Sequence, residues 1–391
     1  MTDVCRFLAL SLCLLLAGTR LMAEETDSLA DDTLAKEVHA SVIVADPGNV
    51  LYSRVGHCAI HMRAPEYNLD YVFSYESEDV RQKVLAFLAG RLRMGMFAIP
   101  IDDYLSNYEK EGRGVREYEL NLPLDVKRNL WRVLDEHVMR GTDLSYDYIT
   151  RGCAHSTLMM LKEGLDSTAI EYGPWPEKFQ TMTRQELTGL QLTEQPWAWA
   201  FLNVICLVQD DGITTENKVI MPKDLIAVLK DARVNGHPLM SSEPKVLLPS
   251  IAKTERPWFT PLHLSVILLM LAFMTFIPAR KCRAWIRGYT ALILAIQFLI
   301  GTLVTYLVFF SDLCCTEWNW LVIPLNPLPL IFWKWRKHWL LPYAAVIVLW
   351  ALAMAVSPHQ ITDTPFVVLS IAIATTYVRC RQSCKETNSI R

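Results

Sequence analysis

Hydrophobic positions divide the chain into two parts that follow different patterns. From residue 261 onward they form long runs, of which "PLHLSVILLMLAFMTFIP" and "YTALILAIQFLIGTLVTYLVFF" are each long enough to cross a hydrocarbon core of about 30 Å. Two further runs, "WLLPYAAVIVLWALAMAV" and "TPFVVLSIAIATTYV", follow them. The pattern predicts an all-α transmembrane bundle over 261–379 and a short tail at 380–391.

A fifth apolar run, "WNWLVIPLNPLPLIFW", lies between these and is interrupted by three prolines. The prolines remove backbone donors, and Asn319 and Asn326 are costly against lipid. Irregular backbone at membrane depth is tolerated where protein or a wet cavity covers it. We therefore expect a broken helix near the outer leaflet that faces the bundle, with the two asparagines as candidates for substrate contact. A kinked span with interfacial tryptophans is the alternative.

The loop charges predict the orientation of five spans. "ARKCRAWIR", "KWRKHW" and the C-terminal tail are basic and should face the cytoplasm, whereas "SDLCCTEW" and "SPHQITDT" lack Lys and Arg. This arrangement places residues 24–260 outside the cytoplasm and the C terminus inside.

The first 23 residues are typical of a secretory signal. Phe7 to Ala17 form its apolar core, and a cleavage point follows Ala23; an uncleaved anchor is the alternative. Either form exports the residues that follow. The formal net charge of −3 argues against nucleic acid as a partner, because phosphate binding requires a basic face.

The exported region, 24–245, mixes two periodicities. "VHASVIVADPG", "LYSRVGHCAIHMRA" and "LDYVFSYE" are strand-like, whereas "EDVRQKVLAFLAGRL", "LDVKRNLWRVLDEHVMR" and "AHSTLMMLKEGL" carry apolar residues at helical spacing. The mixture predicts an α+β domain, joined to the membrane by a linker at 246–260.

Two segments of this domain carry candidate chemistry. Cys153 comes directly before a helical pattern, where the helix N-terminus lowers a thiol pKa and its N–H groups can form an oxyanion hole. His57 and His61 share one face of a predicted strand, and a histidine can take the thiol proton.

Other interpretations of these residues remain open. A Cys58–Cys153 or Cys153–Cys206 disulfide is possible, although the exported face offers an odd number of cysteines. The two histidines are candidate zinc ligands without a convincing third, so no metal site and no cofactor is predicted. An incidental cysteine in a non-catalytic module is the third possibility.

The order of four short motifs resembles a known family. "LYSRVGHCAIHM", "FSYES", "YEKEGRGV" and "YDYITRGCAHST" are similar to the "YSxFGH", "FNYG"-like, "Y..EGR" and "NCST"-like segments of the Lnb N-terminal periplasmic domain family. "IMPKDLIAVL" and "NWLVIPLNPL" resemble later parts of the same proteins. The resemblance implies an exported α+β papain-like (permuted NlpC-like) domain followed by an all-α five-span transmembrane bundle.

The resemblance also implies roles for individual residues. Cys153 is the expected nucleophile and His57 its base. His61 is a candidate third catalytic group because it shares a strand face with His57, and the resemblance does not assign it. Tyr108, Glu111 and Arg113 belong to the matching turn and are candidates for substrate binding, with a purely structural Glu111–Arg113 clamp as the alternative; His155 is an additional candidate. The chain departs from the family at Gly152, where an Asn is usual, and at Val55, where a Phe is usual.

The activity that the resemblance implies is lipoprotein N-acyl transfer at the bacterial inner membrane, with the catalytic domain in the periplasm. An acyl chain from a phospholipid or lipoprotein ester would pass through a Cys153 thioester to the N-terminal cysteine amine of a lipoprotein. A membrane-anchored cysteine peptidase or amidase acting on cell-wall peptides is the alternative, and five spans argue against it because one anchor would suffice.

Overall fold

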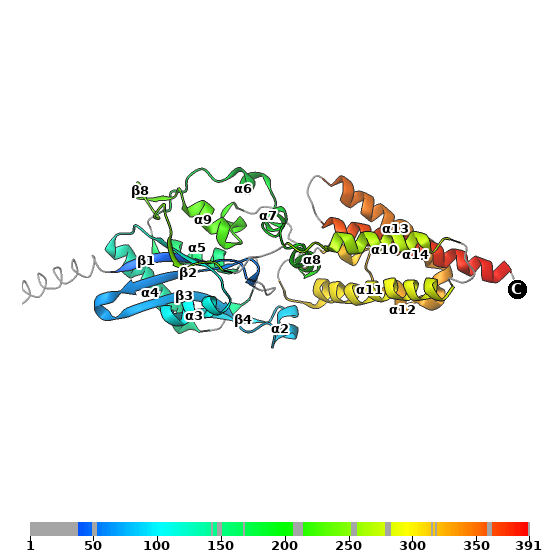
Figure 1. Cartoon of the computed structure of the whole chain (residues 1–391), viewed down its shortest axis with the longest axis horizontal. Helices are drawn as coiled ribbons and strands as arrows, with labels where there is room; N and C mark the ends of the chain where they lie inside the picture. The colour runs from blue at the N-terminus through cyan, green and yellow to red at the C-terminus, as the bar shows by residue number, and fades with distance from the viewer. Residues whose placement is uncertain are drawn as a thin grey trace, which may run out of the picture.

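A computed structural model describes the chain over residues 38–48, 53–141, 144–146, 151–166, 169–205, 214–251, 256–277, 283–313, 316, 319–357 and 362–389, with the side chains of 384–389 excepted. The predicted signal and the cysteines at 206, 314 and 315 lie outside these residues. An α/β domain and a helical bundle lie end to end along the long axis of the molecule (Figure 1).

The α/β domain is built on one antiparallel sheet of seven strands in the order β6-β4-β3-β2-β1-β5-β9. β1 and β2 lie at its centre, and their register pairs Ala45 with His57. Both strands are almost wholly buried because helices cover both faces. The strands are β1 (His39–Ala45), β2 (His57–Ala64), β3 (Leu69–Ser77), β4 (Arg93–Pro100), β5 (Val115–Glu119), β6 (Leu144–Ser145) and β9 (Lys245–Leu248).

The alternation of β2 divides the core of this domain in two. Cys58 and Ile60 point into the larger core, formed with α4 (Leu124–Arg140), α5 (Cys153–Gly164) and α9 (Pro222–Leu229). Ala59 points to the opposite face, which is covered by α3 (Ile101–Lys110). The mixed α/β character predicted from the two periodicities is therefore confirmed. The remaining elements of this domain are α2 (Val84–Leu88), α6 (Glu177–Thr181), α7 (Arg184–Gln191), α8 (Pro196–Ile205), β7 (Arg233–Val234) and β8 (His237–Pro238).

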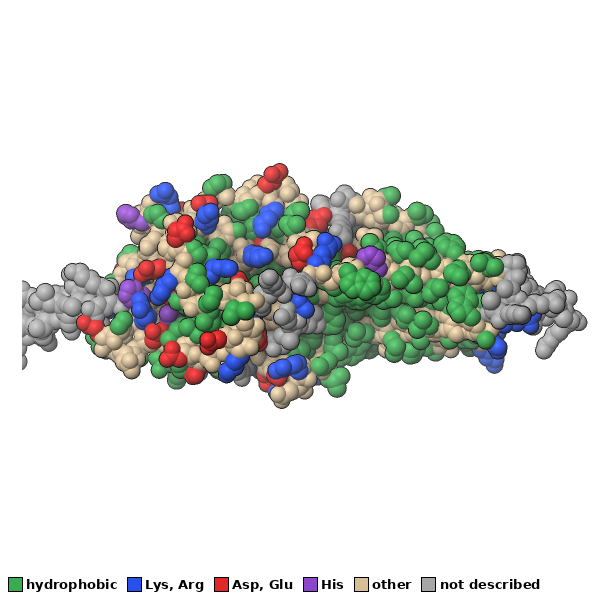
Figure 2. Space-filling view, viewed as in Figure 1, with side chains coloured by type: hydrophobic (Ala, Val, Ile, Leu, Met, Phe, Trp, Pro, Cys, Tyr) green, Lys and Arg blue, Asp and Glu red, His purple; other side chains and the backbone are tan. Residues whose placement is uncertain are grey.

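The C-terminal region is helical, as predicted. It contains α10 (Pro261–Met274), α11 (Arg283–Phe310), α12 (Leu328–Ile331), α13 (Arg336–Val356) and α14 (Thr364–Ser389). Its surface is mostly apolar, whereas charged side chains are scattered over the α/β domain (Figure 2). Among the described residues, α11 and the segment 333–356 are long and apolar enough to cross a membrane, and α10 is a shorter apolar helix.

The proline-rich segment forms no continuous helix, which confirms the predicted interruption. It consists of a 3-10 helix at Trp320–Val322, the short α12, and a 3-10 turn at Trp333–Trp335. Its polar groups are satisfied inside the protein: the Asn326 side chain accepts from the Leu328 N–H at 2.9 Å, and the Asn326 carbonyl accepts from Gln297 at 3.0 Å. Hydrogen bonds within the protein are what irregular backbone at membrane depth requires.

Specific contacts connect the α/β domain to the bundle. Asn319 donates to the carbonyls of Asn203 and Val204 at the end of α8, at 3.0 and 2.9 Å. Ser311, just after α11, donates to the Leu88 carbonyl at the end of α2 at 2.6 Å. The two sequence-predicted asparagines thus make structural contacts: Asn319 holds α8, and Asn326 shapes the broken segment.

Candidate active site

Cys153 is the first residue of α5, so its thiol lies at the N-terminus of a twelve-residue helix. Gly152 precedes it as the N-cap in extended backbone, with φ −64° and ψ 161°, and contributes no side-chain cap. The first N–H groups of a helix have no partner within the helix and favour negative charge. Cys153 is a free thiol, and so is Cys58, so neither of the two disulfides that the sequence left open for Cys153 is present in the structure.

His57 is the first residue of β2, and its imidazole hydrogen-bonds the Cys153 thiol. Its Nε2 lies 2.7 Å from Ser74 Oγ, and the Ser74 hydroxyl donates to Glu76 Oε1 at 2.7 Å. Because the Ser74 proton is used in this way, its oxygen accepts from Nε2–H. Nδ1 is then the ring nitrogen that hydrogen-bonds the Cys153 thiol. In the neutral imidazole this nitrogen carries no proton, so it can accept the proton of the thiol.

Ser74 and Glu76 were missed in the sequence analysis, although both lie in the motif "FSYES" on β3. Alternation along a strand places them on one face, and the Glu76 carboxylate lies 3.4 Å from His57 Nε2. The arrangement Cys153–His57–Ser74–Glu76 is a thiol, a base and a carboxylate relay that orients the base.

The charges of this group support a thiolate. The pKa of Cys153 is held well below its ordinary value, first by the hydrogen bond from the Cys58 thiol and then by the charge and hydrogen bond of His57, against the effect of burial. Burial lowers the pKa of His57, but Tyr108, Cys153 and Glu76 together raise it well above its ordinary value. Burial also raises the pKa of Tyr108, which keeps its proton at neutral pH, so Cys153 and Glu76 are the anions that act on His57 there.

The sequence analysis considered Cys58 only as a possible disulfide partner of Cys153, but the structure places it as a free thiol close to Cys153. It is buried next to His57 in the chain, and its Sγ lies 3.8 Å from Thr157 Oγ1 on α5. Burial raises the pKa of Cys58, so this thiol keeps its proton and can donate to the Cys153 thiolate.

We expect Cys58→Ala to raise the pKa of Cys153 by about 1 to 2 units, because a hydrogen bond to a charged group contributes about 1.5–3 kcal/mol. The measurement is the pH dependence of Cys153 alkylation by iodoacetamide in the full-length protein. Cys58→Ser keeps a donor at the same position and should shift the pKa less. Equal alkylation profiles for all three proteins would show that Cys58 does not act on Cys153.

His61 occupies a different environment from His57. Its Nδ1 lies 2.6 Å from Glu117 and its Nε2 lies 2.6 Å from Asp70. Carboxylates only accept, so both ring nitrogens must carry protons and His61 is an imidazolium. Both nitrogens are thus occupied and neither is left to orient His57. These contacts favour Ser74 and Glu76 over His61 as the groups that orient His57, and they favour a structural role for a charged His61.

We expect His61→Gln to lower stability by about 2 kcal/mol in a pH-dependent way, because His61 is buried and bonded to two carboxylates. Burial lowers the pKa of His61, but the hydrogen bonds to Glu117 and Asp70 raise it above its ordinary value. This stabilisation is therefore complete below the unfolded pKa of about 6.5 and is lost as pH rises through the folded value.

The measurement is the difference in melting temperature between the parent and His61→Gln, in detergent, at about pH 6 and about pH 9. The parent should be more stable at the lower pH, and the difference should shrink at the higher one. A difference that does not change with pH would contradict the assignment of a charged His61.

The turn after α3 holds three further predicted residues in one cluster. Arg113 is buried, donates from Nε to the Asp46 carbonyl at 2.6 Å and from Nη1 to Glu111 at 3.1 Å, and lies over the Tyr108 ring at 4.6 Å. These contacts form the structural clamp that was the alternative to phosphate binding. Tyr108 is therefore held by Arg113 and carries no charge at neutral pH.

His155 lies in the first turn of α5 but on a different side from the thiol pair. It acts on Glu216, a carboxylate that also forms an ion pair with Lys162 at 2.8 Å. The predicted substrate-binding residues thus fall in three places. Tyr108, Glu111 and Arg113 form the clamp, His155 lies on the side of α5 near Glu216, and Asn319 and Asn326 lie in the proline-rich segment.

A cavity of about 360 Å³ opens beside the thiol. Cys153, His57 and Glu76 contribute to its wall. Its apolar lining comes from Val55, Tyr75, Met94, Tyr146 and Ile220, and charged side chains at its rim are Glu78, Asp79 and Arg81. The reactive groups are therefore accessible to a substrate with both an apolar and a polar part.

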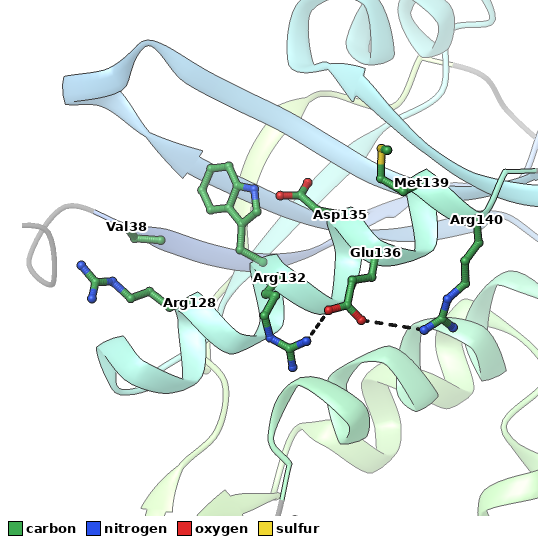
Figure 3. A pocket seen from close by; sticks show the side chains of 8 residues that line it. Val38, Arg128, Arg132, Asp135, Glu136, Met139 and Arg140 are labelled. Atoms are coloured by element: carbon green, nitrogen blue, oxygen red, sulfur yellow. Dashed lines mark hydrogen bonds and ion pairs between the residues drawn. The ribbon is translucent and has the colours of Figure 1, made fainter.

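A second hollow, of about 670 Å³, lies along α4 at a distance from these groups (Figure 3). It is lined by charged residues that pair with each other along the helix: Glu136 bonds both Arg132 and Arg140. The described side chains that line it include no thiol, hydroxyl or imidazole, so this hollow offers no nucleophile comparable to Cys153.

Comparison with known proteins gives two family matches. The Lnb N-terminal periplasmic domain matches residues 25–183, and the Lnb transmembrane domain matches residues 253–386. The first includes Cys153, His57, Ser74 and Glu76, and the second includes α10 to α13 and α14 as far as residue 386. No curated protein and no solved structure matches the chain.

Proposed function

Because this chain belongs to the Lnb family, with both a periplasmic and a transmembrane domain, we propose that it is a lipoprotein N-acyltransferase of the bacterial inner membrane. Membership in the family indicates a membrane enzyme that modifies lipoproteins. The observation that carries the proposal further is the thiol at the start of α5, hydrogen-bonded to a histidine that a serine and a carboxylate orient.

In the first half-reaction, His57 Nδ1 takes the Cys153 proton and the thiolate attacks the carbonyl of an acyl ester. The N–H groups at the start of α5 stabilise the oxyanion that forms. The C–O bond of the ester then breaks, and His57 gives its proton to the leaving alcohol. The acyl chain is left on sulfur as a thioester, and the donor is a phospholipid or the ester of a diacylglyceryl-modified lipoprotein.

In the second half-reaction, the α-amine of a lipoprotein's N-terminal cysteine attacks the thioester. His57 takes a proton from the amine, the C–S bond breaks, and the thiol is restored. The product is an amide, which is more stable than the thioester or the ester, so transfer proceeds in this direction. Glu76, acting through Ser74, keeps Nε2 protonated and the imidazole correctly oriented in both halves.

Two features fit acyl transfer at a membrane surface: the order of His57 and Cys153 in the chain, and the attachment of the α/β domain to a helical bundle. His57 on a strand precedes Cys153 on a helix, the order expected of a permuted, NlpC-like member of the papain-like fold. We propose five membrane crossings, the proline-broken segment among them, with the α/β domain in the periplasm and the C terminus in the cytoplasm. An ester at the outer leaflet then lies beside the cavity of Cys153.

The test is mass spectrometry of the N-terminal peptide of a reporter lipoprotein. The peptide comes from cells that lack their own N-acyltransferase and express either this protein or its Cys153→Ala variant at matched levels. We expect one additional acyl chain on the α-amine with the parent only. Loss of an ester-linked chain at the same time identifies the lipoprotein as the donor. An unmodified amine with a well-expressed parent would refute transfer and favour a cell-wall peptidase or amidase instead.

A further inference from the structure

α8 is a strongly apolar helix of the α/β domain, with the sequence "PWAWAFLNVI". It lies where this domain meets the bundle (Figure 1). Ala200 on α8 is buried in the same core as the bundle helices, and the Trp199 side chain hydrogen-bonds Asp363 just before α14. With the Asn319 contacts to its last carbonyls, α8 is fixed against the bundle at several points along its length.

A groove of about 260 Å³ runs between α8 and the bundle. Helices α8, α10, α11 and α14 all contribute to it, through residues that include Ala200, Phe201, Leu264, Leu268, Ile300 and Phe366. Its two side chains with a polar atom bond elsewhere in the protein: Ser265 donates to the Leu262 carbonyl at 3.0 Å, and Trp197 donates to the Phe259 carbonyl at 2.8 Å. The groove therefore offers apolar surface and no side-chain hydrogen bond to a ligand.

The opposite side of α8 packs against residues that line the cavity of Cys153. Trp199 and Leu202 pack with Val55 and Ile220, and these last two residues also line that cavity. α8, which is about 10 Å across, and the adjoining Val55 and Ile220 therefore separate the candidate catalytic cavity from the apolar groove.

We infer that the groove holds an acyl chain of the lipid donor while the ester of that chain lies at Cys153. This inference rests on the proposed function and identifies the part of the protein that binds the chain. A hydrocarbon chain matches a lining without free polar groups, and the exposed Leu264 and Phe201 at the groove open it toward surrounding lipid. α8 then forms the wall around which the chain bends from the membrane into the periplasmic cavity.

The positions of the groove residues along α10 and α14 also fit a bound acyl chain. Leu264 and Phe366 lie within the first turns of α10 and α14, which begin on the side of the α/β domain, and Leu268 lies one turn further along α10. A chain that enters between these helix ends therefore lies with its ester near the α/β domain and its tail among the bundle helices, which is the orientation of a lipid in the outer leaflet.

The test is a competition between two donors in the purified full-length protein. Phosphatidylethanolamine with two dodecanoyl chains and phosphatidylethanolamine with two hexadecanoyl chains are mixed in equal amounts with a diacylglyceryl-cysteine peptide. Mass spectrometry gives the ratio of the two N-acylated products. Leu264→Trp fills the groove and should shift the ratio toward the shorter chain by about tenfold, because each buried methylene contributes to binding. Leu264→Ala enlarges the groove and should shift the ratio toward the longer chain.

Met270 on the same helix does not line the groove and is about half exposed, so Met270→Trp and Met270→Ala are matched controls that should leave the ratio unchanged. The ratio does not depend on the amount of folded protein, and the mild Leu264→Ala change keeps the test valid if Leu264→Trp does not fold. Equal ratios for the parent and both Leu264 variants would overturn the groove assignment while transfer itself stands. An N-acyl chain that comes only from the peptide's own diacylglyceryl group would overturn the assignment of the groove to a lipid donor. Absence of any N-acylated peptide with the parent would instead overturn the proposed function.

Discussion

Cys153→Ala is expected to lower N-acyl transfer by at least about 1,000-fold, because the thiolate is the only group in the mechanism that forms the covalent intermediate. Cys153 has the contacts that this role requires: a helix N-terminus, a hydrogen bond to His57, and a thiol donor in Cys58. Cys58 cannot replace it as the nucleophile, since Cys58 is buried behind it and keeps its proton. The measurement is the initial rate of transfer to the peptide acceptor by purified parent and variant.

Cys380 provides the control for this substitution. It is another free cysteine among the described residues and lies on α14 in the bundle. Cys380→Ala should keep the parental rate if loss of a cysteine has no general effect on the protein. A Cys153→Ala variant that retains a tenth or more of the parental rate would contradict the covalent mechanism. A tenfold loss of rate corresponds to an increase of only about 1.4 kcal/mol in the activation free energy.

His57→Gln is expected to lower the rate by about 100- to 10,000-fold, the range typical of a lost general base. It is also expected to change the pH profile. In the parent the pKa of Cys153 is lowered, first by the Cys58 hydrogen bond and then by His57, while Tyr108, Cys153 and Glu76 raise the pKa of His57 against burial. The rate should rise as pH passes the pKa of Cys153 and fall as pH passes that of His57.

In His57→Gln the positive charge next to the thiolate is absent. The pKa of Cys153 should therefore increase and the rising limb should move to higher pH, while the falling limb that reports His57 disappears. His61→Gln is the matched control, because it removes the other histidine of β2. Both limbs of its pH–rate profile should stay at the pH values of the parent. A His57→Gln profile with both parental limbs would show that His57 is not the base.

Local patterns were sufficient to predict that Cys153 lies at the start of a helix and that His57 lies on a strand. Cys153 is followed by apolar residues at helical spacing, and α5 begins at that residue. The alternation around His57 predicted a strand, and β2 begins there. Mixed periodicity likewise predicted the α/β domain, and the long apolar runs with an interruption at the prolines predicted the helical region and its broken segment.

Contacts that depend on strand register could not be predicted in the same way. His61 was chosen as third group because it shares a strand face with His57, but its ring is fixed by Asp70 and Glu117 from neighbouring strands. Ser74 and Glu76 lie on β3, and only the pairing of β2 with β3 brings them to His57. Side chains that meet across strands are set by tertiary structure, which a single sequence shows only weakly.

The division of α8 between two surroundings was also not visible in the sequence. Its composition is apolar on all sides, so periodicity did not distinguish the side that packs with Val55 from the side that lines the groove. Asn319 and Asn326 were expected to contact substrate because polar groups are costly in lipid. The structure instead satisfies them with backbone partners in α8 and in the broken segment.

The most direct test of the covalent mechanism is intact-protein mass spectrometry of the purified chain after incubation with phosphatidylethanolamine and no amine acceptor. The account predicts a mass increase of one acyl chain that maps to the Cys153 peptide, disappears in neutral hydroxylamine as a thioester does, and is discharged by the diacylglyceryl-cysteine peptide. The increase should be absent in Cys153→Ala. Transfer to the peptide by a parent that carries no acyl group on Cys153, either with phosphatidylethanolamine or with a diacylglyceryl-cysteine peptide whose amine is blocked, would contradict the account.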